Sequence, residues 1–310
     1  METKRVTVSA VEELIGLYFP VLDHGFIGVR DYMGSDASIE GAARGSYAYG
    51  NRQKTDQRQL LRYLTRHRHT SPTEFVEVVV HCAMPIAVAR QWIRHRTASV
   101  SELSGRYSLM PMLFYTPTDE QIKRQSKSNK QGREGELPKS VVWEWTHDLD
   151  QSRDSTSRLY EWATENDIAR ELARIDLPLS TYTVWTWKID LHNLFHALSL
   201  RCDLHAQWET RQYFNVLAGI AKRLAPISFE AWEDYHFYAK TFSRMEMQII
   251  REFLRQPEGF NGLEFGLPKT EAGEFLAKFD EPTYQNFDLD LTQAKPAEFF
   301  ENKFREAAEG

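Results

Sequence analysis

The chain has 310 residues, of which 42% are hydrophobic, and a formal net charge of −6. This composition predicts a soluble globular protein with one large domain or two modest ones. An acidic total argues against general nucleic-acid binding, which usually requires a basic face. No apolar stretch approaches the roughly 20 residues of a membrane span, and the first residues lack the pattern of a secretory signal. The only cysteines are Cys82 and Cys202, so we expect a reduced, cytoplasmic protein.

The N-terminal part of the sequence predicts two helices. Residues 36–49 predict a short helix that Asp36 caps and that breaks at Gly45. Residues 56–68 predict a second helix, with apolar positions at helical spacing and basic residues in its last turn, where the helix dipole favours them.

The next stretch predicts a helical turn followed by a strand. In "HTSPTEF", Ser71 and Glu74 have the spacing of a capping box, and Pro72 suits a first helical position. The valine-rich residues 76–81 alternate in hydrophobicity as a strand does.

A third helix is predicted for residues 85–96, opened by Pro85, with Arg90 and Arg94 on one face. The serine-rich "TASVSELSG" that follows predicts a loop, because serine and threonine compete for backbone hydrogen bonds and Gly105 breaks a helix.

The second half of the sequence predicts mostly helix. Residues 118–140 are polar and nearly free of apolar side chains, which predicts a surface loop. Helical periodicity returns after this loop, again across 191–225, and once more near residue 250. We expect one domain over 1–240 and a partly helical C-terminal extension over 241–310.

Positive charge is concentrated in one segment. From Arg90 to Arg106, four arginines and Glu102 leave a local charge of +3 with His95 neutral, which suits a small anionic ligand. Arginine forks and the N–H groups of a Ser/Gly loop together can hold phosphate oxygens. The alternative is structural: solvated arginines at a helix end, a capping box from Ser99 to Glu102, and an ion pair between Arg106 and Glu102. The residues alone leave both open.

Other patterns favour packing over chemistry. His192 and His196 lie four apart, with His205 and Glu209 downstream, a spacing compatible with a metal site. The glutamate of H-E-x-x-H is missing, so we favour histidines that pack or hydrogen-bond. The two cysteines form no C-x-x-C pair and are expected to be packing residues. No G-x-G-x-x-G or G-x-x-x-x-G-K-[ST] motif occurs.

Residues 94–108, "RHRTASVSELSGRYS", resemble the signature R-H-R-x-x-S-x-x-E-x-S-x-R-Y of the flavin-dependent thymidylate synthases. The resemblance covers about residues 24–236 and includes the stretches "DYMGSDASIEGAARGSY", "HTSPTEF", "ARQWIRHR", "ELARIDLPLSTYT" and "LHNLFHALSLRCDLHAQWETRQY". The loop at 118–140 and the tail after 240 lie outside its best-matching parts, and no role is transferred to them.

The resemblance implies an α+β fold in which a mixed sheet combines with long helices. It implies an enzyme that makes dTMP from dUMP, with methylenetetrahydrofolate as carbon donor and NADPH as reductant through FAD. It further implies a homotetramer with active sites between subunits, no metal, no catalytic cysteine, and neither nucleic acid nor membrane as a partner.

The resemblance also assigns site residues by motif match. For dUMP it implies a pocket lined by Gln91, Trp92, Ile93, Arg94, Glu102, Leu103, Ser104, Gly105, Arg106, Arg174 and Arg201. For FAD it implies contacts from Ser46, Ser71, Arg94, His95, Arg96, Glu102, Asp190, Leu191, His192 and His196. Arg201 matches the residue that polarises the uracil and favours its ionisation at N3, a role that suits a permanent cation.

Two other classes of function remain as alternatives. One is a non-catalytic nucleotide-binding or regulatory protein on the same scaffold. The other is a metal-dependent hydrolase that uses His192, His196 and His205. A flavin spectrum would argue against the hydrolase, and dUMP-dependent NADPH oxidation would separate an enzyme from a binding protein.

Overall fold

The computed structural model describes residues 5–45, 56–127, 130–255, 273, 275–280 and 282–309. Their contacts divide the chain into two compact units, residues 1–229 with 287–310 and residues 230–286. Residues 287–310 therefore group with the first unit. The expected domain boundary at residue 240 stays a prediction. No helix in the described ranges combines the length and apolar character that crossing a bilayer requires.

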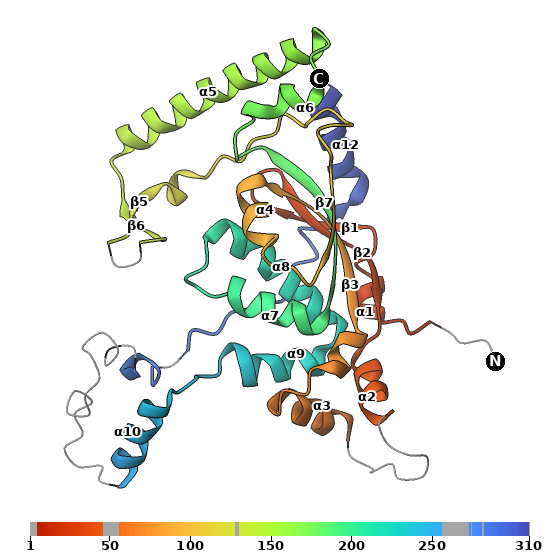
Figure 1. The fold of residues 1–310 in the computed structure, drawn as a ribbon, viewed down its shortest axis with the longest axis vertical. Helices are drawn as coiled ribbons and strands as arrows, with labels where there is room; N and C mark the ends of the chain where they lie inside the picture. The colour runs from red at the N-terminus through yellow and green to blue at the C-terminus, as the bar shows by residue number, and fades with distance from the viewer. Residues whose placement is uncertain are drawn as a thin grey trace. The chain divides into compact units, whose positions relative to one another are not determined.

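The first unit is built on a six-stranded sheet with the strand order β4-β7-β3-β2-β1-β8 (Figure 1). Each neighbouring pair of strands is antiparallel. The strands are β1 (Leu17–Val21), β2 (Gly25–Met33), β3 (Glu77–Pro85), β4 (Ser99–Glu102), β7 (Tyr182–Asp190) and β8 (Lys295–Pro296). A separate antiparallel hairpin pairs β5 (Lys123–Gln125) with β6 (Arg133–Glu136).

Helices and short helical turns connect these strands. The α-helices of the first unit and its border are α1 (Ser9–Glu12), α2 (Asp36–Arg44), α3 (Gln57–Arg66), α4 (Ile86–Trp92), α5 (Lys139–Glu165), α6 (Arg170–Ala173), α7 (Leu191–Arg201), α8 (Trp208–Leu224), α9 (Pro226–Trp232) and α12 (Ala297–Glu309). Tight 3-10 turns form at η1 (Ser71–Phe75), η2 (Asp119–Gln121) and η3 (Arg174–Asp176).

The second unit is small. It contains a π-helical turn, η4 (Glu233–Phe237), and α10 (Arg244–Arg255). Its described apolar core consists of Ile249 and Phe275, with Phe242 and Ile250 packed against them.

Aromatic side chains cover one face of the sheet from α4 and α8. Trp92 of α4 is fully buried and its ring contacts Trp187 of β7 at 5.2 Å and Phe214 of α8 at 4.9 Å. Alternation along β7 places Trp185 on this same face, where it also contacts Trp92. This face therefore holds a large part of the core.

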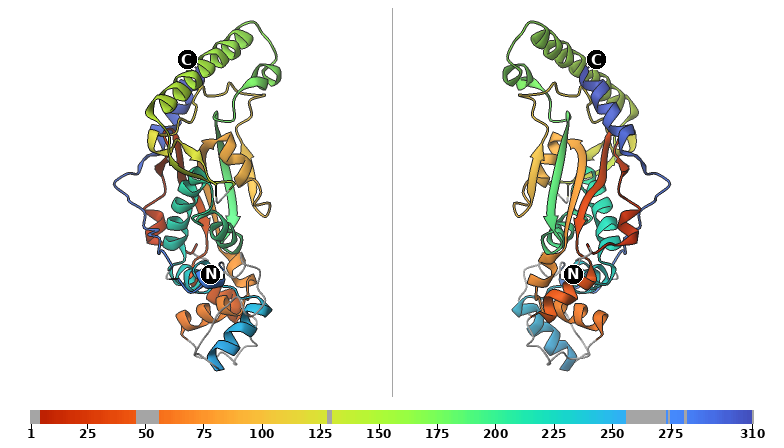
Figure 2. Two further views of the ribbon diagram at one scale, coloured as in Figure 1. Left: turned by 90° about the vertical axis from the view of Figure 1, so that its left-hand side faces the viewer. Right: turned by 90° about the vertical axis from the view of Figure 1, so that its right-hand side faces the viewer.

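The opposite face is covered by α12, which lies on the other side of the strands from α4 (Figure 2). Phe300 and Phe304 of α12 pack against Tyr18, Phe26 and Tyr182 of the sheet. A Cβ at position 28 would fall 1.8 Å from the ring of Tyr18, so glycine there lets that ring lie across β2. The C-terminal segment thus completes the sheet.

The predicted fold class is confirmed, since an antiparallel sheet packs with long helices such as the 27-residue α5. The sheet differs from the expected mixed sheet, because every strand pair in its ladder is antiparallel. Because neighbouring strands run in opposite directions, the sheet needs no parallel crossover connection.

Two predicted helix caps were wrong. Ser35, rather than Asp36, caps α2, and Ser35 with Ser38 completes a capping box. The Asp36 carboxylate instead accepts hydrogen bonds from Ile227 N at 2.8 Å and Ser228 Oγ at 2.6 Å, so a distant helix start uses it. The helix ends at Gly45 as predicted, and residues 46–49 lie outside the described residues.

The helical turn after residue 70 is confirmed as η1, but its capping box is absent. Thr70 precedes the turn and gives no side-chain cap. A capping box needs the backbone N–H groups of a full first α-helical turn. A 3-10 turn of five residues places its N–H groups differently, so Ser71 and Glu74 form no such box.

The helix expected over 85–96 ends at Trp92. Residues after it form tight turns, with His95 N bonded to Trp92 O at 3.0 Å, so Arg90 and Arg94 do not share a helical face. The expected loop that follows contains β4, because Ser99–Glu102 pairs with β7. Pairing with a strand far along the chain overrides the local preference of these serines. Likewise, the surface loop expected over 118–140 holds the β5–β6 hairpin.

Candidate active site

The arginine-rich segment runs from the end of α4, along the edge strand β4, into a tight turn. Glu102 ends β4, and its Oε1 accepts a hydrogen bond from Thr183 Oγ1 at 2.7 Å. Leu103 N then bonds to Val184 O at 2.8 Å, and the chain turns so that Ser108 N bonds to Ser104 O at 3.0 Å. The segment is therefore held to β7 on one side and presents its turn at the sheet edge.

One group of predicted site residues gathers where α4, α7 and α8 meet; we call Gln91, His95 and Arg201 the Arg201 cluster. Arg201 Nε donates to His95 Nε2 at 3.1 Å, and Arg201 Nη2 donates to the Gln91 carbonyl at 3.2 Å. The Gln91 side chain is in turn bonded to Gln207, and Thr210 Oγ1 donates to it at 3.4 Å. Arg201 is partly buried and held by neighbours of its own chain.

The protonation state of this cluster follows from its contacts. His95 Nε2 accepts a hydrogen bond from Arg201. Because a guanidinium group only donates hydrogen bonds, Nε2 bears no proton and a neutral His95 carries its proton on Nδ1. Burial, followed by the charges of Arg201 and His196, lowers the pKa of His95 to about 4. Burial also lowers the pKa of Arg201, but a guanidinium stays charged near neutrality. The cluster therefore presents one positive charge.

A second group lies at the turn after β4; we call Gly105, Arg106, Glu171 and Arg174 the Arg106 cluster. Arg106 forms an ion pair with Glu171 at 3.1 Å, and both side chains are more than half exposed. A Cβ at Gly105 would lie 2.8 Å from Met110 Sδ and 3.1 Å from Arg174 Cδ. The missing side chain lets Arg174 approach the turn closely. The ion pair between Arg106 and Glu102 in the structural alternative is absent, because Arg106 pairs with Glu171 and Glu102 accepts from Thr183.

Three predicted site arginines carry charge that the described residues leave unmatched. The guanidinium groups of Arg94, Arg96 and Arg174 form no hydrogen bond or ion pair with any residue in the described part of the chain. Arg94 and Arg96 are exposed. Cations without an internal partner are available to an external anion.

The residues expected at FAD have varied surroundings. Ser46 lies outside the described residues. Ser71 lines a cavity of about 590 Å³ together with His69, Thr70 and Tyr63, and its turn packs against α7.

Asp190 caps α7, accepting from Asn193 N at 2.9 Å and from Asn193 Nδ2 at 2.7 Å. Leu191 is buried and its N–H is bonded to Val76 O at 2.8 Å. His192 is partly exposed and His196 is exposed. Of these four, the two histidines have the side chains most accessible to a cofactor.

The remaining predicted dUMP residues divide by burial. The Trp92 side chain is fully buried in the core, so its ring presents no surface to a substrate. Ile93 is 40% exposed, and Leu103 and Ser104 are partly exposed beside the turn. Their contacts with dUMP stay predictions.

Sequence reasoning missed three partners of the site residues: Thr183, Glu171 and Gln207. Thr183 could have been suggested by the alternation of β7, which places it beside an edge strand. Glu171 and Gln207 come from separate turns, and nothing in their local sequence marks the contact.

The alternative metal reading has no support from side-chain grouping. Among the residues that the structure describes, no three His, Cys, Asp or Glu side chains gather as a metal site. Glu209 instead accepts hydrogen bonds from Arg133 at 2.9 Å and Tyr115 at 3.0 Å. Cys82 and Cys202 are buried, and burial raises the pKa of both thiols. This environment suits packing residues and disfavours a thiolate nucleophile.

An antiparallel sheet with an arginine-rich edge loop and unmatched guanidinium groups has the chemistry to bind a small anionic ligand. Residues 29–227 match the family model of the thymidylate synthase complementing proteins. The chain is 43% identical over 278 residues to the flavin-dependent thymidylate synthase of Wolbachia pipientis wMel, covering 90% of this chain and 98% of that protein. The Dictyostelium discoideum flavin-dependent thymidylate synthase is 45% identical over 239 residues, 74% of this chain and 78% of its own.

A solved structure supports the same assignment. The UMP/dUMP methylase PolB from Streptomyces cacaoi, bound with 5-Br UMP, superposes with a TM-score of 0.63 at 27% identity, covering 70% of this chain and 97% of PolB. The chain belongs to the family of flavin-dependent thymidylate synthases.

Proposed function

We propose that the protein catalyses the reductive methylation of dUMP to dTMP. In the balanced reaction, dUMP, methylenetetrahydrofolate, NADPH and a proton yield dTMP, tetrahydrofolate and NADP⁺. Family membership and the names of the relatives support the methylation of dUMP. NADPH as reductant, methylenetetrahydrofolate as carbon donor and a cytoplasmic location are the finer parts of the proposal.

The observation that carries the proposal is the set of unmatched cations around the signature segment. The side chains of Arg94, Arg96 and Arg174 have no polar partner among the described residues, and the backbone N–H groups of Ser104 and Gly105 donate to none of those residues. A nucleotide monophosphate brings a dianionic phosphate and a uracil with several acceptors. Forked guanidinium groups suit such oxygens better than single ammonium groups.

Within this site, Arg201 is the residue we assign to uracil activation. Its Nε and Nη2 are directed at His95 and the Gln91 carbonyl, which fixes the plane of the guanidinium and leaves Nη1 for substrate. A preorganised cation stabilises negative charge that develops on the ring as N3 ionises. His95, neutral near physiological pH, orients Arg201 without cancelling its charge.

The hydroxyl and guanidinium donors of the predicted FAD residues suit a flavin cofactor. A cavity of about 590 Å³ at Ser71 offers hydroxyl groups, and Arg94 and Arg96 could meet a diphosphate. When bound, FAD supplies the two-electron chemistry that links NADPH to the methylation. Ser71, Arg94, Arg96, His192 and His196 would hold it. Asp190 is a weaker candidate because both its oxygens already accept from Asn193.

We further propose a homotetramer with active sites shared between copies. Large apolar side chains are exposed on α5 and in the segment after α6, including Trp143 (67%), Trp162 (55%), Ile175 (76%) and Leu179 (63%). Apolar exposure of this extent marks interaction surfaces. No hydrogen bond or ion pair between described residues joins the Arg201 cluster to the Arg106 cluster, so two copies could each supply one half of a site.

The function is tested by a turnover assay with the purified protein. We expect a yellow protein with a flavin spectrum, NADPH oxidation that depends on dUMP, and dTMP formed when methylenetetrahydrofolate is present. Omitting dUMP is the matched control. A protein that binds dUMP and FAD without forming dTMP would be a regulatory relative, and the enzymatic proposal would fail.

A further inference from the structure

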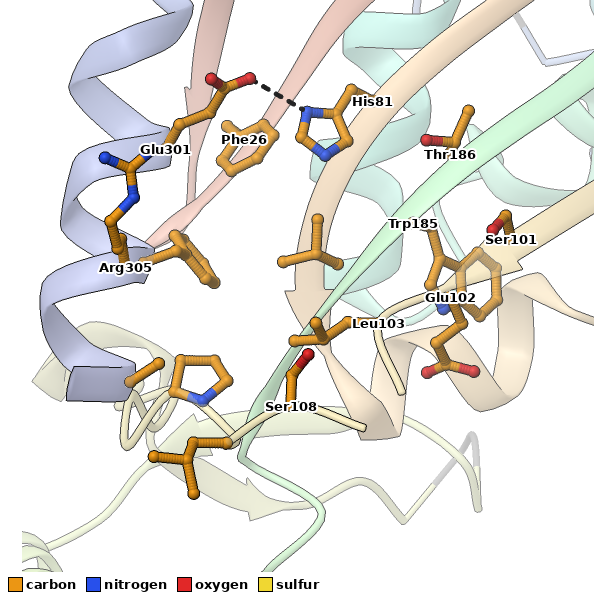
Figure 3. Close-up of a pocket in the computed structure, with 15 residues that line it drawn as sticks. Phe26, His81, Ser101, Glu102, Leu103, Ser108, Trp185, Thr186, Glu301 and Arg305 are labelled. Carbon is orange, nitrogen blue, oxygen red and sulfur yellow. Dashed lines mark ion pairs between the residues drawn. The ribbon is translucent and has the colours of Figure 1, made fainter. Parts of the chain in front are cut away.

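A cavity of about 480 Å³ lies between α12 and the sheet and is bordered by Ser101, Glu102 and Leu103 (Figure 3). Its volume lies in the usual range of small-molecule pockets. Glu102 and Leu103 are the residues assigned to substrate or cofactor that border it. The cavity lies wholly within the first unit of the chain.

The walls of the cavity are mainly apolar. They include Phe26 of β2, Val184 of β7, Leu103 and Pro111 of the segment after β4, and Phe304 of α12. Phe26 and Phe304 contact each other edge to face, with ring centroids 5.7 Å apart. Aromatic edges and aliphatic side chains favour a flat, apolar guest.

One wall carries a histidine with a fixed tautomer. His81 Nδ1 accepts a hydrogen bond from Arg30 Nη2 at 2.9 Å and lies 2.8 Å from the Tyr18 hydroxyl. Because arginine can only donate, Nδ1 bears no proton and a neutral His81 carries it on Nε2. Figure 3 shows this second ring nitrogen turned into the space over Leu103. It has no partner among the described residues.

His81 remains a neutral donor near physiological pH. Burial, followed by the charge of Arg30, lowers the pKa of His81 to about 4. The nearby Glu301 raises it only in part, since Arg30 Nη2 binds Glu301 Oε1 at 2.7 Å and satisfies that carboxylate. The wall therefore offers one N–H directed at an acceptor on a guest.

A cation lies at the α12 side of the cavity. Arg305 is exposed and lines the cavity, and its guanidinium forms no hydrogen bond or ion pair with any residue in the described ranges. Ser108 and Thr186 add hydroxyl groups to the lining. Seven of the fifteen lining residues are polar or charged, including Glu102 and Glu301, and they surround an apolar centre that can orient a small ligand.

This cavity and the Glu102 carboxylate lie on opposite faces of the sheet. Glu102 bonds to Thr183, and Thr183 alternates with Trp185 and Trp187 on the face covered by α4. Val184 and Thr186 point to the α12 face instead. The Glu102 carboxylate is therefore directed away from the cavity, although the residue borders it.

We propose that this cavity is a second binding site, which takes a small flat aromatic molecule carrying one acidic group. The ring lies among Phe26, Leu103 and Phe304, an acceptor on the ring takes the His81 Nε2–H, and the acidic group pairs with Arg305. Of the residues assigned to dUMP or FAD, Leu103 contributes a side chain to this site and Glu102 borders it, so the test below includes dUMP as a competitor.

The test measures binding of anilinonaphthalene sulfonate, an aromatic anion that fluoresces in apolar surroundings, to the flavin-loaded full-length protein. We expect one saturable site per chain. Arg305→Ala should weaken it about 10- to 100-fold, the effect of losing a charge-assisted contact, and His81→Phe about tenfold. Ala308→Trp, which fills the cavity from α12, should abolish it.

Arg251→Ala on α10, another exposed arginine, is the matched control and should bind the dye as the unchanged protein does. The flavin spectrum and the melting temperature establish that each variant is folded. Saturating dUMP should leave dye affinity within about threefold of its starting value, as expected for separate sites. Competitive displacement by dUMP, or unchanged binding in both Arg305→Ala and Ala308→Trp, would overturn the proposal.

Discussion

The Arg201 cluster and the Arg106 cluster both present positive charge, but they hold it differently. Arg201 is partly buried and bonded to His95 and to the Gln91 carbonyl, so its geometry is set before substrate arrives. Arg106 is exposed and pairs with an equally exposed Glu171, a contact that is weak in water. A fixed cation suits charge that develops during reaction, whereas an adaptable one suits anchoring of a charge already present.

The largest effect should follow from Arg201→Ala. Removing a preorganised donor to developing charge lowers turnover about 10²- to 10³-fold, with FAD content retained and dUMP affinity changed little. Single-turnover methylation and the dUMP dissociation constant measure the two parts. Arg211→Ala is the control, since among the described residues Arg211 donates only to the Leu204 carbonyl, at 2.9 Å. Near-normal turnover in Arg201→Ala would mean that the activating charge belongs to another residue.

Arg106→Ala should mainly weaken dUMP binding, by about 2 kcal/mol or roughly 30-fold. The expected loss lies at the lower end for charged hydrogen bonds, because the exposed Arg106 must first leave Glu171. Glu171→Gln sharpens the comparison: it frees Arg106, so dUMP should bind equally well or up to about threefold more tightly. Titration calorimetry measures both. If Arg106→Ala lowered turnover at saturating dUMP as much as Arg201→Ala, the two clusters would not differ in role.

The low pKa values of His95 and His81 should also show in the pH dependence of stability. His95 and His81 have folded-state pKa values of about 4 against 6.5 in the unfolded chain. Between these values the unfolded chain binds protons that the folded chain does not, so stability is full above pH 6.5 and falls as pH drops toward 4. Urea unfolding of His95→Phe and His81→Phe across this window should give a shallower pH slope. An unchanged slope in both variants would contradict neutral, buried histidines.

The smallest functional effect is expected at the cysteines. Replacing Cys82 and Cys202 with Ala should leave turnover within about tenfold of the unchanged protein, because neither environment stabilises a thiolate. Some stability should be lost, about 1 to 2 kcal/mol for each buried side chain. Loss of methylation with dUMP and FAD still bound would reinstate a cysteine nucleophile.

Local patterns predicted the helices and the β3 strand because their periodicity comes from neighbouring residues. The sequence also marked the arginine-rich segment as a candidate anion site, which stays a prediction. It missed β4, whose serines favour a loop until β7 pairs with them. It missed Ser35 as a cap, since Asp36 is an equally good capping residue and a distant helix start claims it.

The contacts within the two clusters could not be predicted for a related reason. Arg201 and His95 are separated by 106 positions, and Arg106 and Glu171 by 65, so only the folded chain brings them together. The C-terminal segment was expected as an extension, yet β8 pairs with β1 and α12 covers a sheet face. The local sequence of a short strand or an amphipathic helix does not indicate which surface it will cover in the fold.

The central claim is that the two clusters act in one site assembled from different copies of the chain. Arg201→Ala and Arg106→Glu are each expected to be inactive at a dUMP concentration near the dissociation constant of the unchanged protein. Equal amounts of the two variants are mixed, allowed to exchange subunits and assayed for dTMP formation. The account predicts recovery to about a quarter of the full rate, since random mixing restores both halves in that share of sites. Activity no higher than the sum of the separate variants would show that each site is built within a single chain.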